Sequence, residues 1–162
     1  MVFLVAPAAA ESDRYTSTSG FFEIDIPDGW IPVDGGVHAE TAFAPPSGLK
    51  NGNIQFGVTA SFGNLTTEAR GLASPGPLND VQDFLIDDIP CVSFTSTARG
   101  NLKINGAVCQ FSVEAEDDDN EDYSFFILGT SPEKDYDDQT KIFWDTVHSL
   151  DWSQDVEKPQ PK

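Results

Sequence analysis

The sequence has few basic residues. Nine lysines and arginines stand against 27 aspartates and glutamates, which gives a formal net charge of −18 and a pI near 4.1. Such a field repels phosphate backbones and anionic headgroups, so we expect no nucleic-acid partner and no direct insertion into a membrane. Two interpretations of the acidity stay open: a surface that keeps the protein soluble, or a surface made for a basic partner or divalent cations.

The sequence also lacks the motifs of common catalytic sites. It has no G-x-S-x-G nucleophile elbow and no G-x-x-x-x-G-K-[ST] phosphate loop. His38 and His148 lie far apart in the sequence and no C-x-x-C pair occurs, which makes a poor zinc set. We therefore expect no catalytic residues and no cofactor, although almost any two carboxylates of so acidic a chain could meet as a hydrolytic pair.

Long hydrophobic runs are missing, because no stretch reaches the ~18 apolar residues that a membrane-spanning helix needs. Residues 1–10, MVFLVAPAAA, instead resemble the end of a secretory signal, with Ala8 and Ala10 at the positions that a signal peptidase reads. The basic region that normally precedes such a run is absent, so an accidental match is the alternative. We expect a soluble protein exported to the periplasm or the cell exterior.

The length of 162 residues suits a single domain with one core. We interpret residues 1–19 as a signal remnant followed by a mobile leader, because residues 12–19 are polar and rich in Ser and Thr. The polar segment 153–162 holds two prolines and is expected to be a disordered tail. We therefore expect residues 20–152 to form the single folded domain.

The sequence has only two cysteines, Cys91 and Cys109, which would fit one disulfide in an exported protein. Cys109 shares strand parity with Phe111, which points it inward, but Cys91 has the opposite parity to Val92. The two need not face each other. A disulfide and a pair of buried thiols therefore both stay open.

Alternating apolar residues predict strands. The stretch FFEIDIPDGW, residues 21–30, predicts a first strand that ends in a turn before Trp30. In residues 53–62 five apolar residues share one parity, which is the clearest strand pattern in the chain. Residues 123–128 are apolar on both parities, so this strand requires cover on both faces of its sheet.

Two helices and one tight turn are predicted from the remaining patterns. Apolar stripes and capping residues predict main helices at about 78–89 and 135–150. Asn105-Gly106 is a strong hairpin signal, so the strands before and after it are expected to pair through this turn. The tripeptide Asn64 to Thr66 matches a glycosylation acceptor or, more simply, a turn.

Several of these parts, in this order, resemble the PsbP-like superfamily, which groups PsbP, Mog-like and DcrB-like proteins. They are FxIDIPDGW, a middle helix, a hairpin at residues 104–107, an aromatic strand and a closing helix that ends IFWDTVHSLDW. The resemblance covers about residues 20–152 and implies an α/β (α+β) fold, an α/β/α sandwich around a mostly antiparallel sheet of about six strands. Bacterial members are typically exported accessory, binding or stress-related proteins. No residue matches a family motif for catalysis.

Two candidate sites follow from the residues. Asp117, Asp119 and Glu121 alternate in the acidic stretch EAEDDDNED and could supply oxygen ligands to calcium, although a solvated hairpin tip explains the same pattern. Trp30, Phe43 and Trp144 could line a groove for an apolar ligand or peptide, or could simply fill the core.

These observations favour a non-enzymatic exported domain that acts through a surface or groove on a protein partner or small ligand. The alternatives are an acidic interaction protein that serves as a solvating coat and, with least support, an unrecognised hydrolase. The oligomeric state is left open.

Overall fold

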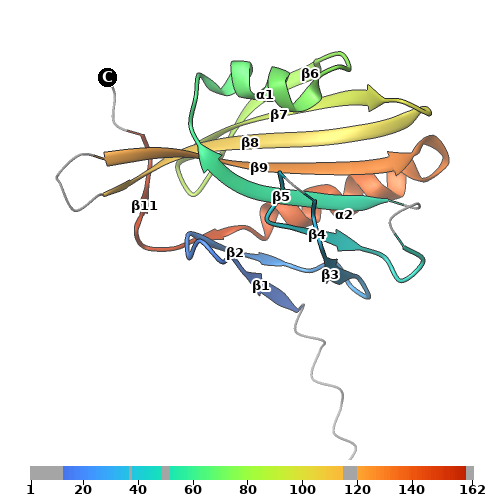
Figure 1. The fold of residues 1–162 in the computed structure, drawn as a ribbon, viewed down its shortest axis with the longest axis horizontal. Coiled ribbons are helices and arrows are strands. Elements are labelled where there is room, and N and C mark those ends of the chain that lie inside the picture. The colour runs from blue at the N-terminus through green and yellow to red at the C-terminus, as the bar shows by residue number, and fades with distance from the viewer. Residues whose placement is uncertain (1–12, 37, 49–51, 115–119, 160–162) are drawn as a thin grey trace, which may run out of the picture.

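The computed structural model describes residues 13–36, 38–48, 52–114 and 120–159 (Figure 1). In chain order the elements are β1 (Arg14–Thr16), β2 (Phe22–Asp25), β3 (Ile31–Val33), β4 (Thr41–Ala44), β5 (Asn53–Ala60), α1 (Leu65–Ala73), β6 (Asn79–Ile86), β7 (Ile89–Ala98), β8 (Leu102–Glu114), β9 (Asn120–Pro132), a 3-10 turn (Glu133–Asp135), α2 (Tyr136–His148), β10 (Asp151–Trp152) and β11 (Val156–Glu157).

The strands form one large and one small antiparallel sheet. The large sheet has eight strands in the order β3-β4-β5-β9-β8-β7-β6, with β11 added to β8. The small sheet has the order β1-β2-β10. The predicted antiparallel α/β class is confirmed. The large sheet exceeds the expected six strands, and the predicted first strand lies in the small sheet instead.

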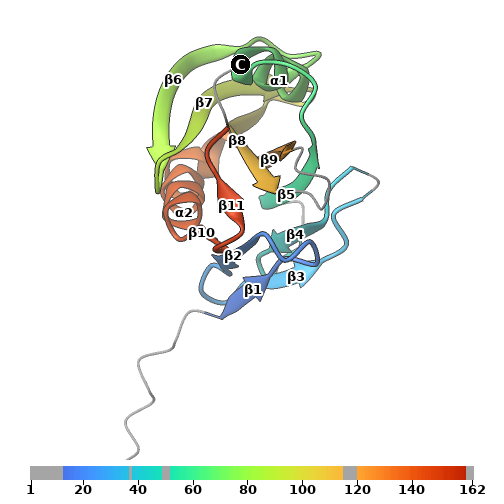
Figure 2. The same ribbon diagram turned by 90° about the vertical axis from the view of Figure 1, so that its left-hand side faces the viewer.

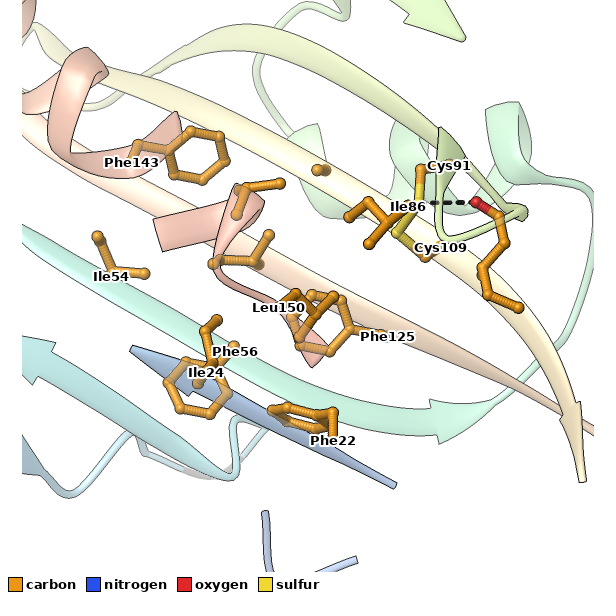
Figure 3. Close-up of a cluster of buried hydrophobic side chains, with 14 of the residues drawn as sticks. Phe22, Ile24, Ile54, Phe56, Ile86, Cys91, Cys109, Phe125, Phe143 and Leu150 are labelled. Carbon is orange, nitrogen blue, oxygen red and sulfur yellow. Dashed lines mark hydrogen bonds between the residues drawn. A yellow bond between two sulfur atoms is a disulfide. The ribbon is translucent and has the colours of Figure 1, made fainter. Parts of the chain in front are cut away.

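The large sheet is covered on both faces (Figure 2). On one face, side chains of β7, β8 and β9 pack against α2 and the small sheet and form the larger core (Figure 3). On the other face, Val92, Phe94 and Val108 pack against Ala69 and Ala73 of α1. The apolar residues of β9 divide between the two, with Phe125 and Ile127 in the larger core and Leu128 against the smaller one. This confirms the α/β/α sandwich that a strand apolar on both faces predicts.

The predicted helix at 78–89 is wrong, because these residues form β6 and the turn into β7. The apolar stripe that predicted it does not share a buried face, since Leu85 is 65% exposed and Val81 is also exposed. Asp87 and Asp88 have φ angles of 49° and 70° and make a two-residue hairpin turn. Asp tolerates this left-handed conformation better than most residues, so the pair favours a turn over a helical surface.

The helix α1 lies where the sequence predicts a glycosylation acceptor or a turn and no helix. The Asn64 side chain caps α1 by accepting a hydrogen bond from the Thr67 backbone N–H at 2.8 Å. An N-cap residue of this type satisfies a donor that the first turn leaves free. The predicted closing helix is confirmed as α2.

The predicted hairpin at Asn105-Gly106 is also wrong. Both residues lie inside β8, and the turn between β7 and β8 is formed by residues 99–101. The Asn105 side chain is buried and bonds to Thr140 and Tyr136 of α2. Asn105 therefore joins the sheet to α2, a tertiary role that a turn signal does not reveal.

Both ends of the chain contain more order than predicted. Residues 14–16, placed in the mobile leader, pair with β2. Residues 156–157, placed in the disordered tail, pair with Val113 and Ser112 of β8. Residues 1–10, interpreted as a signal remnant, lie outside the described residues.

Cys91 and Cys109 are directly paired across β7 and β8 and are joined by a disulfide, with their Cα atoms 4.0 Å apart. Both side chains lie in the larger core (Figure 3). The opposite parity of Cys91 and Val92 is no obstacle, because both faces of this sheet are buried and Val92 points to the α1 side.

Candidate functional site

A pocket of about 460 Å³ lies beside α1, on the face of the sheet opposite α2. Because α1 packs over β7 and β8, it leaves part of β5 and β9 uncovered on this face. We call this hollow the α1 pocket. Its walls come from the connection before β4, from β5, β8 and β9, and from α1 with the loop before it: His38, Ala39, Gln55, Thr59, Phe62, Glu68, Gly71, Leu72, Val108, Ser124, Phe126 and Leu128.

The α1 pocket is mainly apolar. Phe126 and Leu128 of β9 form its floor and Leu72 of α1 a wall, while Phe62 lies at its side with 70% of its surface exposed. An exposed apolar side chain that adjoins an apolar hollow extends it into a contiguous apolar patch, which is the kind of surface that marks a binding site. The volume lies in the range of pockets that hold small organic ligands or single large side chains.

A buried carboxylate fixes the position of α1 next to this pocket. Glu68 is 2% exposed and accepts hydrogen bonds from the Phe62 backbone N–H at 3.0 Å, from Gln110 at 3.1 Å, and from the hydroxyls of Ser61 and Ser124. Each carboxylate oxygen receives two donors. Glu68 is therefore engaged by the protein itself, and its role is to hold α1 and the Phe62 loop against β8 and β9.

A second hollow of about 480 Å³, which we call the Glu40 hollow, lies on the opposite face of the same sheet edge. It shares His38, Ala39 and Thr59 with the α1 pocket. Its other lining residues are Thr18, Ser19, Phe21, Glu40, Val58, Ala60 and Tyr123.

Glu40 is held in place from the small-sheet side. Its carboxylate accepts hydrogen bonds from the Tyr15 hydroxyl at 2.8 Å and the Ser17 hydroxyl at 2.8 Å. Burial raises the pKa of the Tyr15 phenol, a hydrogen bond from Thr41 lowers it, and the neighbouring Glu40 raises it further. Tyr15 consequently stays protonated at neutral pH and keeps donating to Glu40.

Two aromatic rings flank the Glu40 hollow. The Phe21 and Tyr123 ring centroids are 5.2 Å apart, and both residues pack against the larger core. Tyr123 donates its hydroxyl to the Glu121 carboxylate, and this hydrogen bond raises the pKa of Tyr123. The hollow thus combines a carboxylate with aromatic surface.

The structure does not bring the predicted groove residues together. Phe43 is 0% exposed in the larger core, and Trp144 packs against Phe84 and Phe143. Of the three, Trp30 lines a hollow of about 350 Å³ between the turn after β2 and α2. Two of the acids there are already paired, Asp25 with Arg14 at 2.7 Å and Asp145 with Lys141 at 3.0 Å. Phe43 therefore fills the core, which is the alternative that the sequence left open, and a role of Trp30 and Trp144 in binding stays a prediction.

The calcium prediction is not tested by the structure. Asp117 and Asp119 lie outside the described residues, and Glu121 is exposed at the start of β9. Within the described part of the chain, no group of three or more His, Cys, Asp or Glu residues could hold a metal ion. Calcium binding stays a prediction, to be checked by titration calorimetry against a variant with Asp117, Asp119 and Glu121 changed to Asn. Equal heats from the two proteins, or none, would contradict it.

Sequence reasoning missed both hollows. Phe62 shares the parity of Ile54 and Phe56, which predicts a core position, yet it follows the end of β5 and is exposed. The burial of Glu68 has no signal in the sequence, since it depends on donors from β8 and β9.

Among the described residues, no helix is long and apolar enough to cross a membrane.

No protein-family model and no curated protein matches the sequence. Twelve chains of solved structures match in fold, and two of them are the following. The solution structure of cyanobacterial PsbP (CyanoP) from Synechocystis sp. PCC 6803 matches with a TM-score of 0.63 and 13% identity, over 87% of this chain and 92% of that chain. LpqN, involved in cell envelope biogenesis of Mycobacterium tuberculosis, matches with a TM-score of 0.58 and 6% identity, over 90% of this chain and 87% of that chain. The chain therefore has the fold of the PsbP-like superfamily, as the sequence resemblance predicts.

Proposed function

We propose that the protein is a non-enzymatic accessory domain that binds an apolar group of a protein partner or small ligand in the α1 pocket. The observation that carries this proposal is the exposed Phe62 beside the apolar floor made by Phe126 and Leu128. Burial of apolar surface at such a site stabilises a complex by roughly 25 cal/mol per Å² before the costs of association are subtracted.

Binding suits this pocket better than catalysis. Its one buried carboxylate, Glu68, has both oxygens occupied by donors of the protein and is not offered to a substrate. The similarity to PsbP and LpqN supports an accessory domain of this fold, and it carries no site, since function depends on residues and not on the fold.

We further propose that the protein is exported. The disulfide between Cys91 and Cys109 supports an oxidising compartment, and residues 1–10 end in small residues as secretory signals do. Alkylation of the protein in intact cells of its host tests this. Two cysteines protected until a reductant is added are expected, whereas two freely alkylated thiols would contradict export.

The net charge of −18 favours a second candidate, an acidic interaction protein that acts as a solvating coat. The two candidates differ in what an apolar probe does. A binding domain holds a neutral dye at one saturable site, whereas a convex acidic coat offers it no such site.

Nile red, a neutral dye whose fluorescence rises in apolar surroundings, is the probe. We expect saturable binding to the wild-type protein and at least about tenfold weaker binding to Phe62→Ser, equivalent to about 1.4 kcal/mol. The matched control is Leu85→Ser on β6, because Leu85 is 65% exposed and Phe62 is 70% exposed. Equal loss in the two variants, or no saturable binding to the wild type, would overturn the α1 pocket as a binding site.

A further inference from the structure

Half of one edge of β5 carries no strand. β9 pairs with the whole of β5, from Asn53 to Ala60, whereas β4 pairs only with residues 54–56 (Figure 1). The Glu40 N–H donates to the Phe56 C=O at 2.9 Å, which shows that the backbone groups of Phe56 point to the β4 side. Because these groups alternate along a strand, those of Val58 and Ala60 point to the same side.

Beyond Glu40 no described residue continues the pairing. The backbone groups of Ser61, an odd-numbered residue, should point to the other side of the strand, toward β9. The Ser61 N–H does donate to the backbone C=O of Asp122 in β9, at 3.1 Å. In the described part of the chain, which does not include residue 37, no hydrogen bond reaches the outer N–H or C=O of Val58 and Ala60. These groups form a short open strand edge, which we call the β5 edge.

The molecule fills the corresponding gap on the other side of the sheet with its own chain. There β7 stops pairing with β8 at Cys109, and β11 pairs with Ser112 and Val113 farther along the same edge (Figure 1). Such a sheet therefore accepts a short added strand where a longer neighbour ends, and the β5 edge offers the same opportunity.

The two outer strands of the large sheet, β6 and β3, carry protection against pairing. β6 has a register shift between Asn79 and Gln82, and Asp80 within it has a φ of 52°. β3 is three residues long and contains Pro32. Irregular, charged and proline-containing edges discourage pairing, and the β5 edge at Val58 and Ala60, although short, has none of these three features.

The two hollows lie on opposite faces of the β5 edge. Thr59 points toward the α1 pocket, and Val58 and Ala60 point toward the Glu40 hollow. Successive side chains of a strand point to opposite faces, so two consecutive residues of an added strand would enter different hollows.

The two hollows favour different side chains. The α1 pocket, with Phe62, Phe126 and Leu128, suits a large apolar residue. The Glu40 carboxylate already accepts hydrogen bonds from Tyr15, Ser17 and the Thr18 N–H, but unlike Glu68 it is only half-buried. A Lys or Arg side chain in this hollow would therefore be attracted by the carboxylate charge and by the Phe21 and Tyr123 rings, without displacing these donors. The net charge of −18 also attracts a basic partner over longer distances.

We propose that an extended segment of a basic protein partner adds as a strand to the β5 edge in line with β4. It places a large apolar residue in the α1 pocket and an adjacent Lys or Arg in the Glu40 hollow. This inference rests on the proposed binding function of the α1 pocket and names its partner class. Main-chain hydrogen bonds supply affinity in this mode, and the alternating pockets supply specificity.

Selection of random heptapeptides displayed on phage against the full chain tests the proposal. We expect the selected peptides to share an aromatic or large aliphatic residue next to a Lys or Arg. Peptides with apolar residues three and four apart would indicate a helix in the pocket, which would overturn the strand but leave the apolar binding function intact. A library that yields no binding peptide would also overturn the strand.

N-methylation then tests the backbone pairing. In a selected peptide, N-methyl groups on amides of one alternating set should weaken binding by about tenfold each, as expected for a lost hydrogen bond at an interface. The same change on the other set should leave the affinity within about twofold. Equal effects at all positions would overturn the pairing.

A double-mutant cycle tests the basic residue. Glu40→Gln in the protein and Lys→norleucine in the peptide should each weaken binding, and the combined change should weaken it no more than either alone. The affinity for the unmodified peptide should also fall as the salt concentration rises. Additive losses would show that the lysine does not contact Glu40, which would overturn this assignment. Phe62→Ser should weaken the same peptide, and Leu85→Ser should not.

Discussion

The Phe94 side chain of β7 occupies the space that a side chain at Gly106 of β8 would need. The two residues are directly paired, and a Cβ atom placed on Gly106 would lie 2.1 Å from Cζ of Phe94. Phe94 belongs to the core beneath α1. An aromatic ring lying over a strand glycine covers the backbone that glycine leaves bare, so this pair fixes how α1 sits on the sheet.

Gly106→Ala is expected to destabilise the protein by about 1–3 kcal/mol, because the added methyl group forces a buried ring to move. Urea unfolding measures the change. Gly71→Ala in α1 is the matched control, since its new Cβ would meet only Phe62 at 3.9 Å. Alanine stabilises a helix relative to glycine, so this control should be neutral or up to about 1 kcal/mol more stable. A neutral Gly106→Ala would contradict the role given to Phe94.

Gly106 also explains why one turn is mispredicted. Asn105-Gly106 has the composition of a hairpin turn, yet both residues are required inside β8, Asn105 to bond α2 and Gly106 to receive Phe94. The helix at 78–89 fails for a related reason, because an edge strand with exposed Val81 and Leu85 imitates a helical stripe. Local composition predicts the sheet and α2, but it does not reveal contacts between distant strands.

Glu68→Gln is expected to destabilise the protein by about 1.5–3 kcal/mol, because hydrogen bonds to a buried charged acceptor are exchanged for weaker ones and a donor is added where donors already converge. Chemical unfolding at neutral pH measures it. Glu133→Gln provides the control, since Glu133 is exposed. The two variants having equal stability would contradict the role of Glu68 in holding α1.

Tyr15→Phe should flatten the alkaline stability profile. Burial raises the pKa of Tyr15 above the usual tyrosine value of about 10 in the folded protein. Its contribution to stability is therefore complete below the unfolded pKa and is lost as pH rises through the folded pKa, because the unfolded chain ionises first. Between pH 8 and 11, wild-type stability should fall more steeply than that of Tyr15→Phe. Parallel profiles would contradict the partly buried hydrogen bond from Tyr15 to Glu40.

Replacement of both cysteines, Cys91→Ala with Cys109→Ala, should lower the free energy of unfolding, measured with urea, by about 3 kcal/mol. The reason is that the disulfide closes a loop with a sequence separation of 18. The wild-type protein unfolded with and without reductant gives the same comparison independently. Unchanged stability on reduction would show that the bridge does not constrain the unfolded chain.

The candidate site is less predictable from sequence than the fold. The acidity that suggests a basic partner is visible in the composition, and so is the strand that becomes β5. The α1 pocket exists because α1 covers β7 and β8 and leaves part of β5 bare, and the β5 edge exists because β4 begins only at Thr41, opposite Phe56. Both depend on where elements stop relative to one another, and element boundaries are the least certain part of any sequence interpretation.

The most direct measurement is amide hydrogen exchange of the isotope-labelled protein, followed by NMR with and without a selected peptide. If a partner strand adds to the β5 edge, the Val58 and Ala60 amides become protected on binding, while Thr59, which faces β9, is unchanged. Protection confined to α1 and the Phe62 loop, with Val58 and Ala60 exchanging as before, would contradict strand addition.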